Sequence, residues 1–529
     1  MSASKIPVLI VGAGSVGLFA AVFLAHHGVA AQVVERAPGP SIHPRATGIG
    51  LRTMEFLREV GLADEVNAAA VHMSAGSRAR VSGATLASID FSSIAAAPTR
   101  SGPASGLITP ATIRGICAQD RLDAVLAPAA AKRGVVIRYS TAVVGLEQDA
   151  GGVTARLDDG TAVRADYVIA ADGVRSGVRA ALGIGTSGPG ALGNPKMSIL
   201  FRADLLPYTR GRTFATGEIT GSDAPGLLVT VDGAQEWIFH TDYHPEAGQS
   251  ADDFTDERSR ALIRTAVGDP ALEPVILSRL SWRARGLLAD RFRDGRVFLV
   301  GDAAHAVPPQ GAFGLNTGAA DAHNLAWKLA AVLGGQAGPA LLDTYETERR
   351  AVAAFTLDQA LLRVAHPHLH WTTGPGAGAA RAAVGMVNGP VVAVGYRYDS
   401  AAVIDARTEL PDTEDLGLVL DATPGSRLPH LWIGEGKSTL DLVRSQFCVL
   451  VGPGSARWLG AARRAGDRLG IAVGAEVIDA PDWQRRTGIT SDGALLVRPD
   501  HIVAWRADAQ GGDPADALYS ALRRLLHCD

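Results

Sequence analysis

The residues best suited to chemistry stand in one run over 301–328, which reads GDAAHAVPPQGAFGLNTGAADAHNLAWK. Its first two residues, Gly301 and Asp302, directly follow an apolar stretch that is typical of a buried parallel strand. A glycine at this point lets the backbone approach a ligand closely, and an aspartate can accept a hydrogen bond from a sugar hydroxyl. The start of the run therefore predicts a ligand-binding loop at the end of a strand.

The middle of the run predicts a stiff turn followed by the start of a helix. The rings of Pro308 and Pro309 fix φ and so stiffen the turn, and Gly314 keeps it free of a Cβ atom. Leu315 and Asn316 can then present backbone N–H groups at a helix N-terminus, where anions and electron-rich carbonyls are favoured. An ordinary strand–loop–helix unit of an α/β domain would explain parts of this pattern, but the whole run is far more specific.

A βαβ unit near the N-terminus supplies the second group of candidate residues. The apolar patterns predict a strand over 8–11, a helix over 15–26 and a second strand over 31–34. Three glycines at GxGxxG spacing join the first strand to the helix, and an acid follows the second strand: Gly12, Gly14, Gly17 and Glu35. This is the arrangement that a dinucleotide-binding fold requires.

Each of these residues has an expected role in holding a dinucleotide. Gly12 makes the tight turn, Gly14 admits the pyrophosphate, and Gly17 allows the helix to pack closely. Glu35 would accept hydrogen bonds from the adenosine ribose. The glycines also interrupt the apolar run over 8–25, which argues against a signal peptide or a membrane anchor.

Over its full length, the run at 301–328 resembles the second FAD-binding motif of the single-component flavoprotein aromatic hydroxylases, the family of p-hydroxybenzoate hydroxylase and phenol hydroxylase. The resemblance implies that Arg45 lies beside the FAD pyrophosphate, that Gln119 contacts the cofactor, and that Asp172 belongs to an Asp-Gly motif serving FAD and NAD(P)H. Asp123 stands where the family usually has Glu, and a solvated helix face stays open as its explanation. The expected FAD-binding residues are Gly12, Gly14, Ser15, Val16, Gly17, Glu35, Arg36, Arg45, Gln119, Asp172, Gly301, Asp302, Pro309, Gly314, Leu315 and Asn316.

Bulk composition narrows the class of protein. The chain has 529 residues, of which 47% are hydrophobic and 20% charged, and its net charge is −4. These values indicate a soluble globular protein and give no reason to expect nucleic acid or a membrane as partner. The cysteines Cys117, Cys448 and Cys528 are far apart and form no CxxC motif, so we expect neither a disulfide framework nor a metal site. A reducing cytoplasm and a monomer or homodimer are expected.

The predicted elements place the chain in the α/β and α+β classes. By resemblance, a Rossmann-like FAD-binding domain of the p-hydroxybenzoate hydroxylase type is interrupted by a β-sheet substrate domain and followed by a thioredoxin-like C-terminal domain. The expected boundaries are 1–75, 105–183 and 283–400 for the first domain, 76–104 and 184–282 for the second, and 402–529 for the third. Because the last domain lacks the redox CxxC motif, we expect it to be inert as a dithiol catalyst and dispensable for flavin reduction.

One predicted strand of the substrate domain carries the candidate substrate contacts, Trp237, Phe239 and His240. His240, like Tyr243 just beyond it, could deprotonate a phenol. Polar residues on an ordinary sheet face would look the same in the sequence, so that interpretation also stays open.

The resemblance implies an FAD-dependent monooxygenase that takes its electrons from NADPH or NADH. In that family the reduced FAD reacts with O₂ to give a C4a-hydroperoxide, whose distal OH passes to an electron-rich ring. Carbonyls near Pro308 and Pro309 would orient this intermediate, and Arg45 would lie near the pivot of a flavin ring that swings between an exposed and a buried position. Only one dinucleotide fold is predicted, so the nicotinamide must bind transiently.

The expected substrate is aromatic, either a polycyclic polyketide or a phenol. By resemblance, phenol hydroxylases and aromatic-polyketide hydroxylases both carry the thioredoxin-like domain, and this domain together with the chain length favours a polycyclic polyketide over a single-ring phenol. Baeyer–Villiger oxygen insertion by the same fold is not separated from hydroxylation by the sequence. A non-catalytic FAD-binding protein, acting in redox sensing or as a scaffold, is the alternative of a different class.

Overall fold

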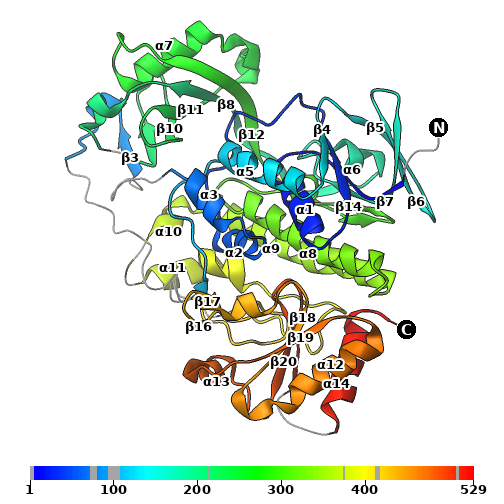
Figure 1. Ribbon diagram of the computed structural model, residues 1–529. Coiled ribbons are helices and arrows are strands. Elements are labelled where there is room, and N and C mark those ends of the chain that lie inside the picture. Colours follow the sequence, from blue (N-terminus) through cyan, green and yellow to red (C-terminus); the bar gives the residue numbers. More distant parts are fainter. Residues whose placement is uncertain are drawn as a thin grey trace.

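The apolar runs next to the cofactor motifs form the first of three main sheets (Figure 1). The computed structural model describes residues 5–71, 80–92, 108–212, 214–372, 374, 376–411, 418–507 and 512–528. Five strands of the first sheet run parallel, in the order β14, β7, β1, β2 and β4. Their bounds are Val297–Leu299, Ala162–Ala170, Lys5–Val11, Ala31–Val34 and Val136–Arg138.

The central strands of this sheet are completely buried. Val8, Leu9 and Ile10 of β1 are each 0% exposed. An uninterrupted apolar run, rather than an alternating one, is what a parallel strand covered on both faces requires. Strand β13 (Arg293–Asp294) closes the edge beside β14, and the hairpin of β5 (Val143–Asp149) and β6 (Gly152–Leu157) continues the sheet from β7.

Helix α1 (Ser15–His26) packs against α8 (Gly314–Leu333) and α5 (Gln119–Lys132). Its sequence, SVGLFAAVFLAH, is apolar on every side, so it forms a buried helix rather than an amphipathic one. Other helices of this part are α2 (Leu51–Glu59), α3 (Ala63–Ala69), α6 (Gly177–Ala181), α9 (Asp343–Ala365), α10 (Pro367–Trp371) and α11 (Ala377–Ala382).

A second sheet of seven strands lies beside the first and is covered by α7 (Asp256–Val267) (Figure 1). Its strands, in spatial order, are β15 (His305–Ala306), β12 (Val275–Ala289), β8 (Thr186–Arg202), β11 (Glu236–Asp242), β10 (Gly226–Thr230), β9 (Thr216–Ile219) and β3 (Arg80–Gly83). The edge strand β15 belongs to the cofactor run at 301–328, so this sheet reaches the candidate site directly.

The C-terminal region holds a mixed four-stranded sheet of the type expected for a thioredoxin-like domain. Its strands, in spatial order, are β19 (Val473–Val477), β18 (Phe447–Val451), β20 (Ala494–Val497) and β21 (Val503–Ala507). One face packs on α12 (Arg457–Leu469) and α14 (Pro514–Leu525), and the other packs against α13 (Pro481–Thr487). A short hairpin of β16 (Trp432–Gly434) and β17 (Lys437–Ser438) lies outside this sheet.

Cys448 lies within β18 and is 0% exposed. Burial raises the pKa of its thiol to about 12, so it carries almost no reactive thiolate near neutral pH. All the cysteines are free thiols. The domain is therefore built without the chemistry of a dithiol catalyst.

The predicted βαβ unit agrees closely with the structure, since the helix over 15–26 and the strand over 31–34 have the predicted bounds. The boundary expected near 402 is less simple. Tyr398 N–H donates to Gly425 O at 2.9 Å, and Ile404 N–H donates to Ala504 O at 2.8 Å, so this segment already belongs to the C-terminal packing. The domain boundaries given above stay predictions.

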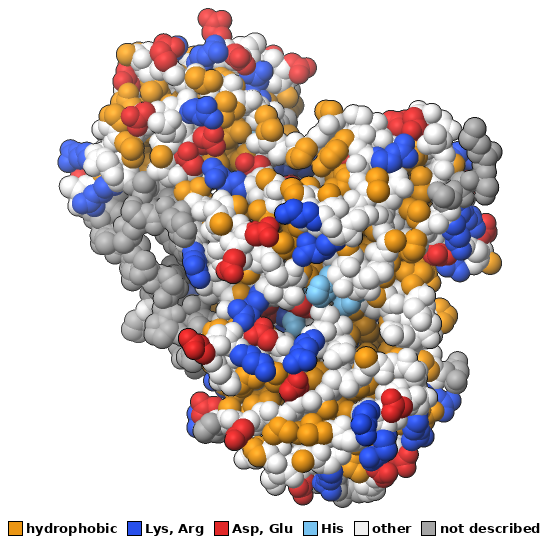
Figure 2. All heavy atoms as spheres, in the orientation of Figure 1, with side chains coloured by type: hydrophobic (Ala, Val, Ile, Leu, Met, Phe, Trp, Pro, Cys, Tyr) orange, Lys and Arg blue, Asp and Glu red, His pale blue; other side chains and the backbone are white. Residues whose placement is uncertain are grey.

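Charged side chains of both signs are intermixed on the face of the molecule shown in Figure 2. That pattern is in keeping with the small net charge of −4. Within the described residues, no helix combines the length and the apolar character needed to cross a membrane.

Candidate active site

Three motifs that are far apart in sequence meet at one edge of the first sheet. Gly12 follows β1, Asp172 follows β7 and Gly301 follows β14, and these strands are parallel neighbours. Their carboxyl ends share the edge at which open α/β sheets bind ligands. Val16 packs between two glycines of the third motif, since a Cβ atom would lie 2.9 Å from its side chain on Gly301 and 2.5 Å from it on Gly318.

The N-terminal glycines have different local geometries. Gly12 has a φ of +106°, and a Cβ atom there would lie 2.4 Å from Ala171 O. A Cβ atom on Gly17 would lie 2.0 Å from Gly12 O, so only glycine lets α1 approach the strand this closely. Gly14 has nothing within 4 Å of the same position. The structure thus leaves open space beside Gly14, where the pyrophosphate is predicted to bind.

The Asp302 carboxylate is exposed to solvent and accepts no hydrogen bond from another described residue. Burial by the surrounding protein nevertheless raises the pKa of its carboxyl, against the opposing charges of His305 and Arg45. A carboxylate that follows a parallel strand and has its acceptor atoms free fits a ribityl hydroxyl of FAD.

Asp172 offers a second unused acceptor at the same edge. Its Oδ2 accepts a hydrogen bond from Val178 N–H at 3.1 Å, while Oδ1 is buried and has no hydrogen-bond partner among the described residues. Buried polar atoms are normally paired, so an orphan of this kind fits a missing ligand. Arg179 ties this loop to the Asp302 turn, because its guanidinium donates to Ala303 O at 2.8 Å.

Asp123 is buried, contrary to the solvated helix face left open for it above. It is 2% exposed and accepts a short hydrogen bond from the Ser15 hydroxyl at the start of α1. Burial raises the pKa of its carboxyl to about 7, although hydrogen bonds from Ser15 and Gln119 oppose the shift. Ser15, Gln119 and Asp123 therefore form one polar cluster under the predicted pyrophosphate position.

Glu35, the predicted ribose acceptor, directly follows β2. Its two carboxylate oxygens accept hydrogen bonds from Ala13 N–H and Ala37 N–H, both at 2.8 Å, so it also fixes the backbone of the glycine turn. Arg36 and Arg45 are both exposed. The charge of Arg45 lowers the pKa of Asp123 and of Asp302, against the effect of burial, so it acts on both of these predicted cofactor-site carboxyls.

The start of α8 is held by the side chain of Asn316. Its Oδ1 accepts hydrogen bonds from Gly50 N–H and the Thr53 hydroxyl, both at 2.7 Å, and its Nδ2 donates to Ala312 O at 2.7 Å. The side chain is thus occupied by the protein. The backbone N–H groups of Leu315 and Asn316, in the first helical turn, are the part that can face a ligand.

The turn predicted at Pro308 and Pro309 is present, and it engages the carbonyl group of Pro309. Pro308 is buried and Pro309 is exposed. Pro309 O accepts a hydrogen bond from Ala312 N–H at 3.0 Å, and Ala312 adopts a positive φ of 55°. Pro309 O therefore has one lone pair engaged in the turn and one left for a ligand.

Trp237 and Phe239 do not face the candidate site, which corrects the expectation from the sequence. They are 1% and 0% exposed and belong to the apolar core between β11 and α7, together with Phe254. Trp237 Nε1 also donates to Ala203 O at 3.1 Å. Successive residues of a strand point to opposite faces, so His240 lies on the other face and stays a candidate.

The face of the second sheet that carries His240 meets the FAD-binding part through His43. His43 Nε2 lies 2.8 Å from Ser198 Oγ on β8, and Nδ1 lies 2.7 Å from Ser278 Oγ on β12. His240 pairs with Ser198 across the strands, and its ring lies 5.7 Å from that of Trp282. His43, Ser198, Ser278 and Trp282 were missed from the sequence, because the sequence does not give the register between these strands.

Acid should destabilise the fold through its buried histidines between pH 6.5 and 4. Burial lowers the pKa of His43 and of His501 to about 4, from an ordinary value of 6.5. In this window the unfolded chain binds protons that the native chain does not, so the free energy of unfolding falls by about 1.4 kcal/mol per pH unit for each such histidine. Thermal unfolding at pH 7 and pH 5 measures the effect.

A His501→Gln variant should lose less melting temperature between pH 7 and pH 5 than the parent does. The same substitution at His244, whose side chain is 45% exposed, serves as the control and should leave the pH dependence unchanged. An identical pH dependence in the parent and in His501→Gln would show that His501 is not the neutral buried group described here.

A separate cavity of about 390 Å³ lies between α1, α2 and the C-terminal region, and His26, Arg58, Asp441 and His501 are among its lining residues. Its buried carboxylates already have partners in the protein. Glu55 pairs with Arg427, and Glu59 lies 2.8 Å from His323 Nε2. The cavity is lined by none of the predicted cofactor residues, so we do not assign the chemistry to it.

Comparison with known proteins defines the class that this geometry belongs to. The family described as FAD binding domain matches residues 5–360, and the family described as aromatic-ring hydroxylase, C-terminal, matches 421–527. The chain therefore belongs to the FAD-binding-domain family, as predicted. It is an FAD-dependent monooxygenase of the aromatic-ring hydroxylase class, with a thioredoxin-like C-terminal domain.

Individual relatives match over almost the full length. Tetracenomycin A2 monooxygenase-dioxygenase of Streptomyces glaucescens is 42% identical, over 99% of this chain and 98% of that protein. 4-Methyl-5-nitrocatechol 5-monooxygenase of a Burkholderia species is 38% identical, with coverage of 99% and 98%. The crystal structure of aklavinone-11 hydroxylase with FAD and aklavinone superposes with a TM-score of 0.85 at 36% identity, covering all of both chains.

Proposed function

We propose that this enzyme hydroxylates a polycyclic aromatic polyketide, with FAD as cofactor, NADPH or NADH as electron donor and O₂ as the source of the oxygen atom. The observation that carries the proposal is the match over the full length of both chains to a hydroxylase whose structure holds FAD together with the polycyclic compound aklavinone. The 42% identity to a tetracenomycin-modifying enzyme supports the same substrate class.

When bound, FAD supplies the redox chemistry, by taking a hydride from the nicotinamide and activating O₂. The residues of this chain hold and orient it. Asp302 and the unpaired Oδ1 of Asp172 would accept hydrogen bonds from its hydroxyls. The open space at Gly14 would admit its phosphates near the charge of Arg45, and the first turn of α8 would present N–H groups to its ring.

On the substrate side, His240 is the group best placed to accept a hydrogen bond from a phenolic hydroxyl. Burial lowers the pKa of His240 to about 4, so it is neutral near pH 7. Its Nδ1 is buried and has no hydrogen-bond partner among the described residues. His43, by contrast, already uses both ring nitrogens on Ser198 and Ser278, which suits a role in joining the two sheets.

The C-terminal domain by itself does not distinguish a polycyclic substrate from a single-ring one, contrary to the expectation from the sequence. A relative named for a single-ring nitrocatechol matches over 99% of this chain, and therefore over the C-terminal domain as well. The polycyclic class is proposed instead on the higher identity to the tetracenomycin enzyme and on the aklavinone-bound structure.

A turnover experiment under ¹⁸O₂ tests the proposal. The purified enzyme with FAD and NADPH or NADH is offered a panel of polycyclic phenols and, in parallel, single-ring catechols. One labelled oxygen on a ring carbon of a polycyclic product is expected, and that compound should also accelerate anaerobic flavin reduction.

Other outcomes decide against the proposal in distinct ways. Labelled oxygen inserted beside a carbonyl, as an ester or lactone, would identify Baeyer–Villiger chemistry instead of hydroxylation. Turnover of the catechols alone would overturn the substrate class. Product without label would overturn oxygen transfer from O₂.

A further inference from the structure

Buried charges join the C-terminal sheet to the two long helices of the FAD-binding part. Arg498, directly after β20, donates to Glu348 of α9 through two nitrogens, at 2.5 and 2.9 Å. The same guanidinium donates to Asp500 at 3.0 and 2.6 Å. The side chains of Arg498 and Glu348 are both 0% exposed, so water does not compete for these contacts.

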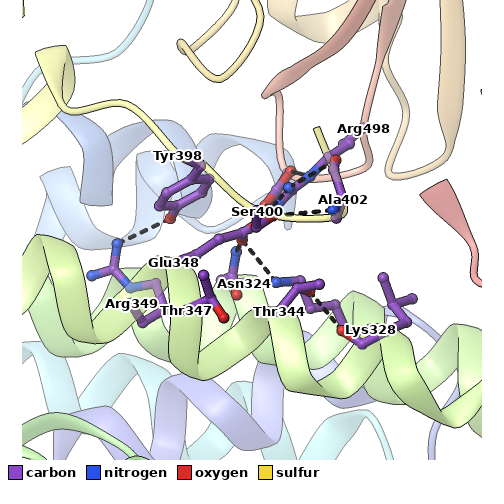
Figure 3. Close-up of polar contacts among 12 residues, drawn as sticks. Asn324, Lys328, Thr344, Thr347, Glu348, Arg349, Tyr398, Ser400, Ala402 and Arg498 are labelled. Atoms are coloured by element: carbon purple, nitrogen blue, oxygen red, sulfur yellow. Dashed lines mark hydrogen bonds and ion pairs between the residues drawn. The ribbon is translucent and has the colours of Figure 1, made fainter. Parts of the chain in front are cut away.

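Glu348 extends the contact to α8 (Figure 3). Its Oε2 accepts hydrogen bonds from Lys328 Nζ and from Asn324 Nδ2, each at 2.7 Å. Lys328 is also 0% exposed. Arg498 and Lys328 carry two positive charges against the two negative charges of Glu348 and Asp500, so the cluster is neutral as a whole. Removing one member would leave an uncompensated buried charge, which is strongly destabilising.

Arg349, the next residue of α9, makes a second connection that reaches the cofactor motif. One of its nitrogens donates to the Tyr398 hydroxyl at 3.0 Å, and Nε donates to Asp321 Oδ1 at 2.7 Å. A third donates to Thr317 O, in the first part of α8, at 3.1 Å. Tyr398 is itself fixed to the C-terminal region through Gly425 O.

Asp321 completes the path to the Asp302 turn. Its Oδ2 accepts a hydrogen bond from Gly301 N–H at 3.0 Å and lies 2.6 Å from His305 Nε2. Gly301 immediately precedes Asp302, and both Asp321 and His305 are 0% exposed. A continuous series of buried contacts therefore runs from the C-terminal region through Tyr398, Arg349 and Asp321 to the turn that carries Asp302.

We propose that the C-terminal region positions the FAD site, with Arg498 and Tyr398 as positioning residues that act through α9 on α8 and the Asp302 turn. The proposal uses the cofactor site described above, but it does not depend on the identity of the substrate. It replaces the expectation that this region is dispensable for flavin reduction. Buried ion pairs contribute little net stability compared with apolar packing, so their use here is better explained by fixing one arrangement than by adding stability.

Tyr398→Phe is the mild test, because it removes only the hydroxyl that accepts from Arg349. The loss of one hydrogen bond to a charged group should raise the FAD dissociation constant about tenfold. Tyr519→Phe, in α14, removes a hydroxyl from a ring that packs against Arg468 and takes no part in this series of contacts. It is the matched control and should bind FAD like the parent. The constant is measured by titrating apoprotein with FAD and following the quenching of flavin fluorescence.

Arg498→Met is the strong test, because it leaves the buried cluster with one negative charge in excess. FAD affinity should fall further than in Tyr398→Phe, and the visible absorption spectrum of the bound flavin should shift. Arg468→Met removes an exposed pair with Asp516 in the same domain and is expected to change neither quantity. If the Arg498→Met variant does not fold, the FAD dissociation constant of Tyr398→Phe alone tests the proposal.

A merely structural role gives a different result. It would lower the melting temperatures of the apoprotein and of the FAD-loaded protein equally, and leave the FAD dissociation constant and flavin spectrum unchanged. That outcome in Tyr398→Phe and Arg498→Met would overturn the proposal. A wrong assignment of the cofactor site would show instead as unchanged FAD affinity in a variant of Asp302 itself.

Discussion

A Gly17→Ala variant should fail to form a stable FAD-binding part. The added Cβ atom would lie 2.0 Å from Gly12 O and 3.1 Å from Gly12 C, and both are backbone atoms that cannot turn aside. Helix α1 is buried against α8 and α5, so it has no room to retreat from the strand. Overpacking of this kind costs about 1–3 kcal/mol or more, which outweighs the gain of about 1 kcal/mol from replacing a helical glycine with alanine.

Thermal unfolding and the flavin content of the purified protein measure this effect. Gly177→Ala is the matched control, because Gly177 starts α6 and nothing lies within 4 Å of its Cβ position. Gly17→Ala should lower the melting temperature and abolish flavin retention, while Gly177→Ala should change neither. A Gly17→Ala protein with the parent's stability and flavin content would disprove the close approach of α1 to the glycine turn.

Local sequence patterns predicted the βαβ unit because every local signal there agrees. The bounds of α1 and β2 were predicted residue by residue, and Gly28, with a φ of +75°, ends the helix as a C-terminal glycine should. The three cofactor motifs were also predictable as a group, because each follows an apolar strand and parallel strands end at one edge.

The orientation of a strand could not be predicted in the same way. Alternation separates Trp237 and Phe239 from His240, but it does not say which set faces α7 and which faces the FAD-binding part. The larger aromatic side chains bury more apolar area, and the structure places them in the core with α7. The interpretation of strand aromatic residues as substrate contacts is therefore wrong where these residues form an ordinary apolar core.

Long-range polar contacts were likewise beyond the sequence. His43 meets Ser198 and Ser278 from 155 and 235 residues away, and Arg498 meets Glu348 from 150 residues away. Taken alone, each of these polar residues would be expected on a solvated surface. They become buried partners only because the folded chain packs its sheets and helices together. Asp123 was open to the same misreading because its helix position gives no hint that the Ser15 hydroxyl lies beside it.

These contacts also show that the C-terminal region and the FAD-binding part are not structurally independent of each other. Arg427 of the C-terminal region pairs with Glu55 of α2, and Arg52 of the same helix donates to Asp500 O at 2.6 Å. Gly50, directly before α2, donates its N–H to Asn316 Oδ1 at the start of α8. The C-terminal region thus contacts both α2 and α8, since Asp500 also accepts a hydrogen bond from Asn324 Nδ2 of α8 at 3.1 Å.

An Asp302→Ala variant should lose FAD while keeping its fold. Asp302 follows β14 with its carboxylate exposed, and burial by the surrounding protein raises the pKa of this carboxyl. A hydrogen bond from a cofactor hydroxyl to this carboxylate is worth about 1.5–3 kcal/mol, which corresponds to a loss in affinity of roughly 10- to 150-fold. The Asp302 carboxylate accepts no hydrogen bond from another described residue, so the melting temperature of the apoprotein should change little.

Flavin released by acid precipitation gives the occupancy, and FAD titration of the apoprotein gives the dissociation constant. Asp302→Asn keeps the shape and one carbonyl acceptor, so its affinity should lie between those of the parent and Asp302→Ala. Asp358→Ala, at an exposed position of α9, controls for loss of charge alone and should bind FAD like the parent. If Asp302→Ala purifies with full flavin, Asp302 does not hold the cofactor hydroxyl. If Asp302→Asn binds as weakly as Asp302→Ala, the negative charge matters more than the acceptor, and Arg45 rather than a hydroxyl becomes the group that Asp302 serves.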